Sequence, residues 1–418
     1  MTAQDRIPRP PKTTGPLARR EARLAWGMLL PTIAVVSLVV ILPLLSVFWI
    51  SFKPVGLADL RPPSPVVRES LRGRPSEPGD AGEIEYRLRN SSQDRPVFGA
   101  TLADMLPEGV VVGETPKPCT VTGDEVACDF GDLEGGERVS VRIPVTLTEA
   151  YFDGGVDIED SAPTLAGSGE NVFTSGEFTL ENFARVFDAD EFLAVLLATV
   201  FYSVFGTLGA LALGLFAAML LNKSFRGQGL LRGLFLFPYV APVIAVAFTW
   251  VNLFDPFSGS ANALLTRMGA IETPINFFGQ RPLALIMVTV FEIWRYFPLS
   301  FLFILARMQS IDSDMYAAAD MDGASPFQKF WHLSLPQLLG ILSVLFLLRF
   351  IWTFNKFDDI FLLTGGNAGT RTLTVNVYEQ AFAISNIGAG AAVAVVIFLC
   401  LLLFSFLFFR YANREEGL

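Results

Sequence analysis

Ionisable side chains occur inside two apolar stretches of the sequence, at spacings that place them on one helical face. Glu292 precedes Arg295 by three residues, and Arg349, Thr353 and Lys356 follow one another at spacings of four and three. Charges are costly to bury in hydrocarbon, so such residues usually face a cavity or a partner. Beside aromatic rings they suit a ligand with both hydroxyl groups and an apolar face. The residues expected to line such a pathway are Glu292, Trp294, Arg295, Tyr296, Arg349, Thr353, Asn355, Lys356 and Asp358.

The same residues also fit a structural role. Glu292 and Arg295 could form an ion pair within one helix, and Arg349 could bridge two helices. Asp358 and Asp359 could lie at the membrane–water interface. The sequence leaves both interpretations open.

The composition narrows the chemistry. Of 418 residues, 52% are apolar and 17% are charged, which is outside the range of ordinary soluble proteins. A single histidine, His332, leaves no ligand set for a histidine metal site or acid–base centre. No Gly-rich phosphate-binding loop with its lysine occurs. These observations exclude a histidine-dependent hydrolase and a histidine metal site, and they indicate that any ATP hydrolysis takes place in another polypeptide.

Six apolar stretches are long enough to cross a bilayer as helices, which takes about 20 residues. The first is too long for a signal peptide and is not followed by a cleavage pattern, so we expect it to be retained. The pattern predicts a mainly α, multi-pass membrane protein whose helical core occupies residues 190–409. The stretches are 24–52, 192–221, 233–254, 282–306, 337–363 and 380–409.

Basic residues accumulate in the loops on one side of these spans. Thirteen lie on that side and only Arg267, Arg281 and Arg371 lie in short loops on the other. By the positive-inside rule, the tails 1–23 and 410–418 are expected in the cytoplasm. The thirteen are Arg6, Arg9, Lys12, Arg19, Arg20, Arg23, Lys223, Arg226, Arg232, Arg307, Lys329, Arg410 and Arg414.

Residues 54–181 form an acidic insert between the first two spans, on the side expected to be external. The insert has 24 acidic and ten basic residues, a net charge of −14, whereas the rest of the chain carries +4. Between about 66 and 148, short runs alternate apolar and polar residues and end at Gly, Pro, Asn or Asp. This pattern predicts a small β-sandwich flanked by linkers. Cys119 and Cys128 lie close together in it, which outside the cytoplasm favours a disulfide over two free thiols.

Residues 310–336, between the fourth and fifth spans, predict two short helices at an angle. Asp312 or Ser313 can cap the first helix, and Gly323 can end it with a positive φ. Residues 325–328 (Ser-Pro-Phe-Gln) have the pattern of a capping box with proline in the first turn.

The second of these helices is expected to carry an exposed aromatic face. Phe327 lies three and four residues before Phe330 and Trp331. A face of this size should be buried, either on the helix ends of the same chain or against a partner.

The 310–336 stretch resembles the coupling loop of binding-protein-dependent ABC importer permeases. The resemblance rests on Asp322-Gly323-Ala324, the aromatic pair, and the following Leu335-Pro336. It implies that the loop docks into a cleft of a nucleotide-binding subunit. The implied contact residues are Tyr316, Ala317, Ala318, Asp322, Gly323, Ala324, Phe327, Phe330, Trp331, Leu335 and Pro336.

Two positions depart from that family's pattern. Ala317 occupies the place of a usual glutamate, and Asp312 the place of a usual proline. The first departure removes a possible ion pair with the ATPase.

The resemblance extends from about residue 25 to the C-terminus, apart from the insert. It is strongest toward carbohydrate permeases of the maltose type, through residues 354–366, 372–373 and 378–382. It implies the type I ABC importer permease fold with six transmembrane helices, and a sugar pathway lined by the ionisable residues named above. The insert resembles bacterial Ig-like surface repeats, and maltose permeases carry an Ig-like insert at the same place, where it contacts the binding protein.

The resemblance also implies a subunit that is not an enzyme and that holds no cofactor or metal of its own, and it implies the partners and the location. These are a second transmembrane permease subunit, a dimer of ATPase subunits that hold ATP and Mg, an external sugar-binding protein, a sugar or sugar derivative, and the lipid of a bacterial inner membrane. No nucleic acid is expected. Three cations along the pathway leave room for an acidic or sulfated sugar.

Two other functions fit the residues. An ion-coupled secondary transporter could use Glu292 or Asp358 for coupling. A membrane-anchored adhesion or assembly protein could work through the insert alone, although a pure anchor should avoid intramembrane charges.

Overall fold

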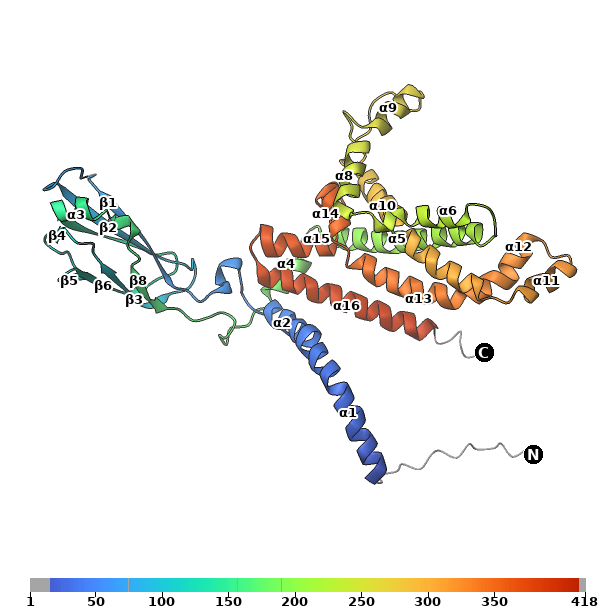
Figure 1. Cartoon of the computed structure of the whole chain (residues 1–418), viewed down its shortest axis with the longest axis horizontal. Helices are drawn as coiled ribbons and strands as arrows, with labels where there is room; N and C mark the ends of the chain where they lie inside the picture. Colours follow the sequence, from blue (N-terminus) through green and yellow to red (C-terminus); the bar gives the residue numbers. More distant parts are fainter. Residues whose placement is uncertain (1–15, 74, 156, 189, 413–418) are drawn as a thin grey trace.

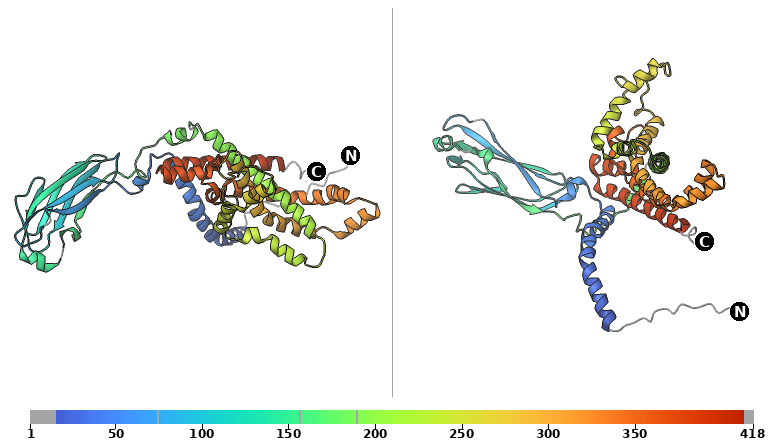
Figure 2. Two further views of the ribbon diagram at one scale, coloured as in Figure 1. Left: turned by 90° about the horizontal axis from the view of Figure 1, so that it is seen from above. Right: turned by 45° about the vertical axis from the view of Figure 1, so that its right-hand side comes forward.

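The computed structural model describes residues 16–412 except 74, 156 and 189, and it forms a helical body and a β-domain (Figure 1). The helical body contains five helices long and apolar enough to cross a membrane, and one bent pair that makes a sixth candidate. The β-domain, residues 65–168, projects beyond one end of these helices (Figures 1 and 2). Parts of both predicted tails, 1–15 and 413–418, lie outside the described residues.

The long helices follow the apolar stretches. Residues 192–221 were expected as one helix, and α5 has these bounds. The first span, α1 and α2, passes through a π-helical turn, η1, and its side chains are exposed along most of α1. The helices are α1 (Pro16–Val36), η1 (Ser37–Ile41), α2 (Leu42–Ser51), α5 (Phe192–Leu221), α10 (Leu283–Gln309), α13 (Leu335–Phe354) and α16 (Ile387–Ala412).

The third expected span, residues 233–254, is wrong as a single helix. Helices α6 (Gln228–Phe235) and α7 (Phe237–Val240) meet α8 (Val243–Leu253) at 89°. Pro242 causes the break, because it lacks an N–H and disfavours helical backbone in the residue before it. Ala241 accordingly has ψ 142°.

The fifth span ends earlier than expected, and the sixth begins later. Helix α13 ends at Phe354 rather than 363, and a separate helix, α14 (Asp358–Thr364), follows the polar run that begins at Asn355. Helix α16 begins at Ile387 rather than 380, after the π-helical turn η5 (Glu379–Ala383) and Ser385, whose φ is 61°. Further short helices, apart from those of the 310–336 loop, are η2 (Leu57–Leu60), α3 (Glu149–Gly154), η3 (Ile158–Asp160), α4 (Glu181–Phe187), α9 (Ser260–Arg267) and α15 (Leu373–Tyr378).

Helices α5 and α10 pack closely because α5 presents glycines to α10. A Cβ at Gly206 would lie 2.9 Å from Glu292 Cγ, and one at Gly214 would lie 2.8 Å from the backbone nitrogen of Phe301. Small residues allow this approach of helix backbones inside a membrane. The packing brings the polar residues of α10 against α5.

The β-domain has two four-stranded antiparallel sheets in the orders β1-β2-β7-β4 and β5-β6-β3-β8. Inward side chains of both sheets share one apolar core that includes Ile84, Leu102 and Ile143. The expected sandwich limit of about 148 is too short, because β8 pairs with β3. The strands are β1 (Pro65–Arg72), β2 (Ala81–Asn90), β3 (Val97–Met105), β4 (Val110–Val112), β5 (Cys119–Thr122), β6 (Glu125–Leu133), β7 (Arg138–Leu147) and β8 (Thr164–Ser168).

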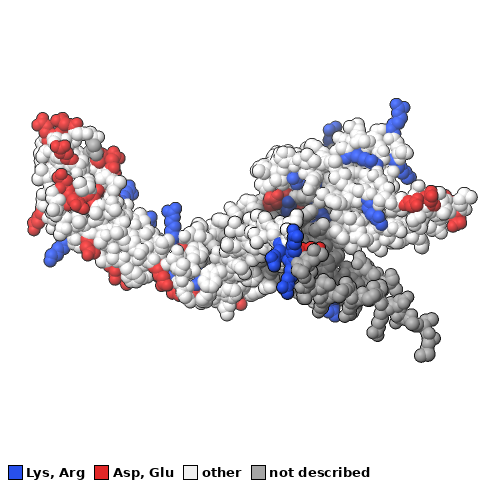
Figure 3. All heavy atoms as spheres, turned by 60° about the horizontal axis from the view of Figure 1, so that its bottom comes forward, with Lys and Arg blue, Asp and Glu red and all other residues white. Residues whose placement is uncertain are grey.

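Cys119 and Cys128 lie directly opposite each other on β5 and β6 and form a disulfide. Figure 3 shows acidic side chains gathered over the β-domain, whereas the surface of the helical body is mostly uncharged.

The two chain segments that connect the β-domain to the helical body are both held by contacts at the end of α2. Lys53, whose side chain is fully buried, donates from Nζ to the carbonyl of Ser175 and lies 4.1 Å from the ring centre of Phe178. The Asn182 amide donates to the carbonyls of Ser51 and Lys53 at 2.9 and 2.8 Å. The chain segments that enter and leave the β-domain are therefore tied to each other.

Candidate functional site

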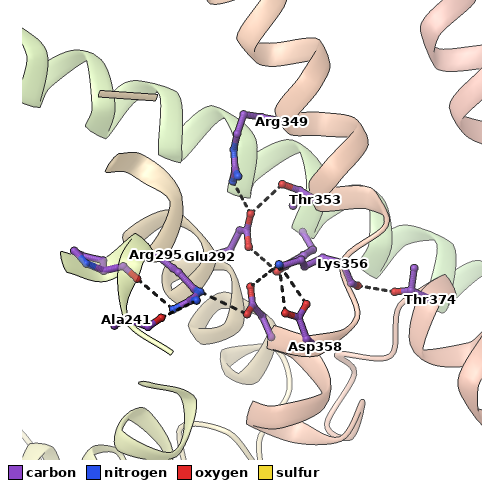
Figure 4. Close-up of polar contacts among 11 residues, drawn as sticks. Ala241, Glu292, Arg295, Arg349, Thr353, Lys356, Asp358 and Thr374 are labelled. Atoms are coloured by element: carbon purple, nitrogen blue, oxygen red, sulfur yellow. Dashed lines mark hydrogen bonds and ion pairs between the residues drawn. The ribbon is translucent and has the colours of Figure 1, made fainter. Parts of the chain in front are cut away.

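Glu292 lies at the centre of a polar cluster between three helices. Its Oε1 accepts hydrogen bonds from Arg349 Nη2 at 2.6 Å and from Thr353 Oγ1 at 2.9 Å, both on α13. Its Oε2 accepts from the hydroxyl of Tyr202 on α5 at 3.0 Å. Glu292 and Arg349 are both almost fully buried. Figure 4 shows the arginine and the threonine converging on the carboxylate.

Asp359 forms a second centre next to the first. Its carboxylate is fully buried, with Arg295 Nε at 4.0 Å and Lys356 Nζ at 3.8 Å. Neither of its oxygens accepts a hydrogen bond from a described residue. The carboxylate is therefore held by charge alone, which leaves its hydrogen-bonding capacity unused.

Arg295 connects this cluster to the break in the bent pair. It does not bond Glu292, so the expected ion pair within α10 is not formed in the described structure. Its guanidinium instead donates to the carbonyls of Pro238 at 3.2 Å and Ala241 at 3.1 Å. These carbonyls lie where Pro242 interrupts the helix, and non-helical backbone at membrane depth needs such partners.

A small cavity of about 150 Å³ opens beside these residues. Tyr296 forms part of its wall, and the ring of Tyr296 lies 4.7 Å from Arg349 Cζ and 4.6 Å from Lys356 Nζ. The lining residues are Tyr239, Glu292, Tyr296, Leu299, Arg349, Trp352, Thr353 and Lys356. The site therefore offers cations, a carboxylate, hydroxyls and aromatic rings around one polar space.

Four expected pathway residues do not line this cavity, and one of them is Arg295, whose guanidinium bonds the carbonyls of Pro238 and Ala241 instead. Trp294 packs on Trp250 with ring centres 5.5 Å apart. The amide of Asn355 donates to the carbonyl of Ile351 on its own helix. Asp358 is half exposed and pairs with Lys356 at 3.3 Å.

The cluster carries no net charge. Its three cations are Arg295, Arg349 and Lys356, and its three carboxylates are Glu292, Asp358 and Asp359. In the sequence the three cations leave room for an acidic sugar, but in the structure each has a carboxylate beside it. Only Glu292, Arg349 and Lys356 of these six residues line the cavity, and the other three lie beside it.

Sequence reasoning missed four residues of the site: Tyr202, Tyr239, Trp352 and Asp359. A weak signal existed for Tyr202, because it begins a run with Ser203, Gly206 and Thr207 at helical spacing, all of them buried. This run of small and polar residues marks the α5 face that packs on α10.

The 310–336 loop lies at the end of the helical body away from the β-domain (Figure 1). Helix α11 (Ser313–Met321) is capped by Asp312, whose carboxylate accepts from the backbone of Asp314 at 2.9 Å. The chain then turns at Gly323, which has φ 75° and open space where a Cβ would be. A hydrogen bond of 2.9 Å between the hydroxyl groups of Tyr316 and Ser334 connects the two arms of the loop, which are the helical segments before and after Gly323.

The second arm is not a separate short helix. Ser325 and Gln328 form the expected capping box at its start. The helix α12 (Pro326–Lys329) then continues through a π-helical turn, η4 (Phe330–Ser334), into α13. Residues 326–354 thus form one continuous helix, since the π-turn accommodates the extra residue without a break.

The loop presents apolar side chains at its tip. Phe327 is 71% exposed, Trp331 is 49% exposed, and their ring centres lie 6.0 Å apart, whereas Phe330 is half-buried. Ala317, Ala318, Asp322 and Pro336 are exposed, and Ala324 and Leu335 are half-buried. The aromatic face therefore does not pack on the helix ends of this chain.

Residues 210–415 match the family described as the binding-protein-dependent transport system inner membrane component. The chain is 35% identical over 210 residues to the inner membrane ABC transporter permease protein YcjO of Escherichia coli (strain K12), covering 50% of this chain and 71% of that protein. The chain belongs to this family of permeases.

Other similar proteins are named as permeases of particular transport systems. The permease is 35% identical to the trehalose/maltose transport system permease protein MalF of Thermococcus litoralis, over 50% of this chain and 70% of MalF. It is 32% identical to the sn-glycerol-3-phosphate transport system permease protein UgpA of Yersinia pestis, over 58% and 82%.

A solved structure shows the fold. A crystal structure of a bacterial ABC transporter involved in the import of the acidic polysaccharide alginate matches with a TM-score of 0.54 at 18% identity, covering 58% of this chain and 86% of that one. The helical body therefore has the type I ABC importer permease fold.

The family also decides what this chain does not do. Permease subunits of ABC transporters are not catalytic, and partner ATPases hydrolyse the ATP. The family favours the permease interpretation over an ion-coupled transporter or an anchored adhesion protein. It also makes the chain a multi-pass inner-membrane protein.

Proposed function

We propose that this permease forms half of the translocation pathway of an ABC importer for a sugar or sugar derivative. The observation that carries the proposal is the polar cavity between α10 and α13, where Glu292, Arg349 and Thr353 meet aromatic side chains. A sugar presents hydroxyls at its edge and carbon–hydrogen groups on its face, which these groups complement. The names of the maltose and glycerol-3-phosphate permeases support a polyol-like substrate.

We further propose the partners and the topology. A second permease subunit completes the pathway, a binding protein delivers the sugar at the β-domain side, and two ATPase subunits dock at the 310–336 loop. The β-domain is external and both termini are cytoplasmic. This arrangement is supported by the loop and the β-domain lying at opposite ends of the long helices.

Coupling follows from these contacts. Closure of the ATPase pair on ATP moves the exposed arm that carries Phe327 and Trp331, and the attached helices change from inward-facing to outward-facing. Reset after hydrolysis releases the sugar inside. The chemistry stays in the partner subunits.

Reconstitution of the complete importer in liposomes tests the substrate site. Trp352 lines the cavity but is 53% exposed, so Trp352→Ala should fold, and it should raise the KM for sugar uptake about tenfold because one ring that stacks on the sugar is removed. Trp250→Ala is the control that removes a ring outside the cavity. Uptake with an unchanged KM in Trp352→Ala, or uptake that persists without the ATPase, contradicts the proposal.

A pair of glycine variants tests the coupling loop. Gly323 and Gly227 both have a positive φ, 75° and 90°, and both have open space where a Cβ would be. Aspartate at either position should cost a similar backbone strain of about 1 kcal/mol. Gly323→Asp should abolish ATP-driven uptake with normal membrane insertion, whereas Gly227→Asp should keep most of it. Equal uptake in the two variants would remove the docking role.

A further inference from the structure

One face of the β-domain is cationic although the domain is strongly acidic. Six of the ten basic residues between 54 and 181 are exposed arginines on the outward face of the sheet β1-β2-β7. Along β2, Ile84, Tyr86 and Leu88 are buried in the core, so the residues between them point outward. The arginines are Arg68 and Arg72 on β1, Arg87 and Arg89 on β2, and Arg138 and Arg142 on β7.

Three of these arginines share one glutamate as their acidic partner. Glu85 accepts from Arg72 at 2.7 Å, from Arg87 at 2.6 Å and from Arg142 at 3.0 Å. Burial alone would raise the pKa of Glu85, but the three arginines outweigh it and lower the pKa to about 2. This carboxylate is therefore ionised at any ordinary pH and fully engaged.

The other three arginines have no acidic partner among the described residues. Arg68 stands directly opposite Arg87, and Arg89 stands directly opposite Arg138. Like charges in directly opposite positions destabilise a sheet. These two pairs do not stabilise the sheet, so their role is expected to lie in binding rather than in folding.

A shallow hollow lies over these residues. It measures about 570 Å³, and its lining includes the four arginines of the two opposed pairs together with Val66 and Ser140. Guanidinium groups donate paired hydrogen bonds in a plane, which matches a carboxylate. Neighbouring positions along one strand face lie about 7 Å apart and neighbouring strands about 5 Å apart, so the groups suit a ligand with several anionic groups in sequence.

We propose that this arginine face binds an acidic oligosaccharide whose rings carry carboxylate groups. Among the described residues no aromatic side chain lines the hollow, so binding there would depend on the paired guanidinium donors, and neither an aromatic anchor of a protein interface nor stacking on a sugar ring would contribute. An acidic peptide strand would pair along an open sheet edge, whereas these arginines lie on the face. The β-domain projects beyond one end of the long helices (Figure 1).

This site is separate from the transport cavity. The cluster around Glu292 is electrically balanced, whereas the arginine face has six cations against the two acids Glu83 and Glu85. The glycan held outside therefore need not be the sugar that is transported. The proposal goes beyond the proposed function, and its test uses neither uptake nor ATP.

The test measures binding to the full-length permease in nanodiscs of uncharged phosphatidylcholine. Fluorescently labelled hexagalacturonate is the probe, and maltohexaose is the neutral match with the same number of rings. We expect hexagalacturonate to bind in a salt-sensitive way and maltohexaose to bind at least about a hundredfold more weakly. Arg89→Gln with Arg138→Gln should weaken binding about a hundredfold, at roughly tenfold for each guanidinium–carboxylate pair removed.

Two control variants separate charge, geometry and location. Lys117→Gln removes one exposed cation of the β-domain outside the arginine face, and binding should stay within about twofold of the parent. Arg89→Lys with Arg138→Lys keeps the charge but loses the paired donors, and should weaken binding about tenfold.

Several outcomes would overturn the proposal. These are equal binding of the two saccharides, no effect of the double glutamine variant, or stronger arginine-dependent binding to polyglutamate or to phosphatidylglycerol vesicles. Folding supplies a further check, because removing an opposed pair should leave the unfolding temperature of the β-domain equal or higher. A lower unfolding temperature would make the arginines structural.

Discussion

The β-domain and the helical body each bury one glutamate beneath arginine, but in opposite surroundings. Glu85 lies on the outward face of a sheet, under three arginines whose side chains remain about half exposed. Glu292 lies between helices, and its partner Arg349 is as buried as the glutamate itself. The β-domain keeps its apolar residues inside and its charges outside, whereas the helical body has charges inside and apolar side chains outside.

The comparison teaches that the same ion pair depends on different things in the two places. At the sheet surface, water can replace a lost partner. The ion pair there therefore contributes more to the orientation of the side chains than to the free energy of unfolding. Between the helices both partners are buried, so an arginine that loses the glutamate would remain as a buried charge without its counter-charge. The helical pair is therefore expected to be sensitive to any change of one partner.

The largest predicted effect comes from breaking the helical pair. Glu292→Gln should destabilise the helical body by about 3–5 kcal/mol, because Arg349 is left buried without its counter-charge. All six tryptophans lie outside residues 54–181, so the unfolding transition seen by tryptophan fluorescence reports the helical body alone. Glu85→Gln should leave that transition unchanged.

The double variant sharpens this prediction. Glu292→Gln with Arg349→Gln removes both charges and should recover a large part of the lost stability. If the double variant is as unstable as Glu292→Gln alone, the pair is not the source of the loss.

The second prediction concerns the disulfide of the β-domain. Cys119→Ala with Cys128→Ala should cost this domain about 2–3 kcal/mol, since the closed loop is short. The backbone amides of strands β1 to β8 should then lose their protection from hydrogen exchange at a lower temperature, while the tryptophan transition stays in place. A common shift of both signals would show that the two parts unfold together and would break the comparison.

A third, smaller effect is the pH dependence of the β-domain. Burial, opposed by a hydrogen bond from Ser161 and reinforced by Asp104, raises the pKa of Glu69 to about 7. The folded domain then holds this proton more tightly than the unfolded chain, so stability is full below about pH 4 and falls as the pH rises through 7.

Hydrogen exchange is the measurement for this third prediction. Exchange at residues 158–168 should speed up between pH 5 and 8 beyond the intrinsic pH effect, because Ser161 Oγ donates to Glu69 at 2.6 Å. Glu69→Gln should flatten the profile. Glu85 has the opposite sign, since its stabilising effect is lost only as the pH falls from about 4 toward 2.

The smallest predicted effect is at Asn355. Its exposed amide bonds its own helix, so Asn355→Ala should change sugar uptake by less than about twofold. A large loss of uptake would mean that Asn355 turns into the pathway during transport, and that the cavity seen beside Glu292 is incomplete.

The sequence predicted the positions of the helices better than their ends. The length of the apolar stretch predicted both ends of α5 correctly, because no charge or proline interrupts residues 192–221. The bent pair was missed although Pro238 and Pro242 lie inside it, because hydropathy alone does not register a missing N–H. The strand β8 was missed because its five residues, with exposed and half-buried side chains in alternation, look like linker.

The site could be predicted only as a set of residues, not as pairs. Helical spacing placed Glu292 beside Arg295, but its partner Arg349 lies 57 residues away on another helix. Which cation meets which carboxylate depends on how α5, α10 and α13 cross, and that crossing depends on glycines such as Gly206. Capping at Asp312 and Ser325 was predictable because both interactions are local.

One continuous helix connects the tip of the 310–336 loop to the buried cluster. From Pro326 to Arg349 it measures about 35 Å at 1.5 Å per residue, with no non-helical joint that could absorb displacement. If a partner subunit pushes on Phe327, as proposed above, this helix would transmit the displacement to Arg349, the partner of Glu292. At the π-helical turn 330–334 the backbone hydrogen bonds could shift by one residue. Such a shift would change how far a displacement at Phe327 moves Arg349.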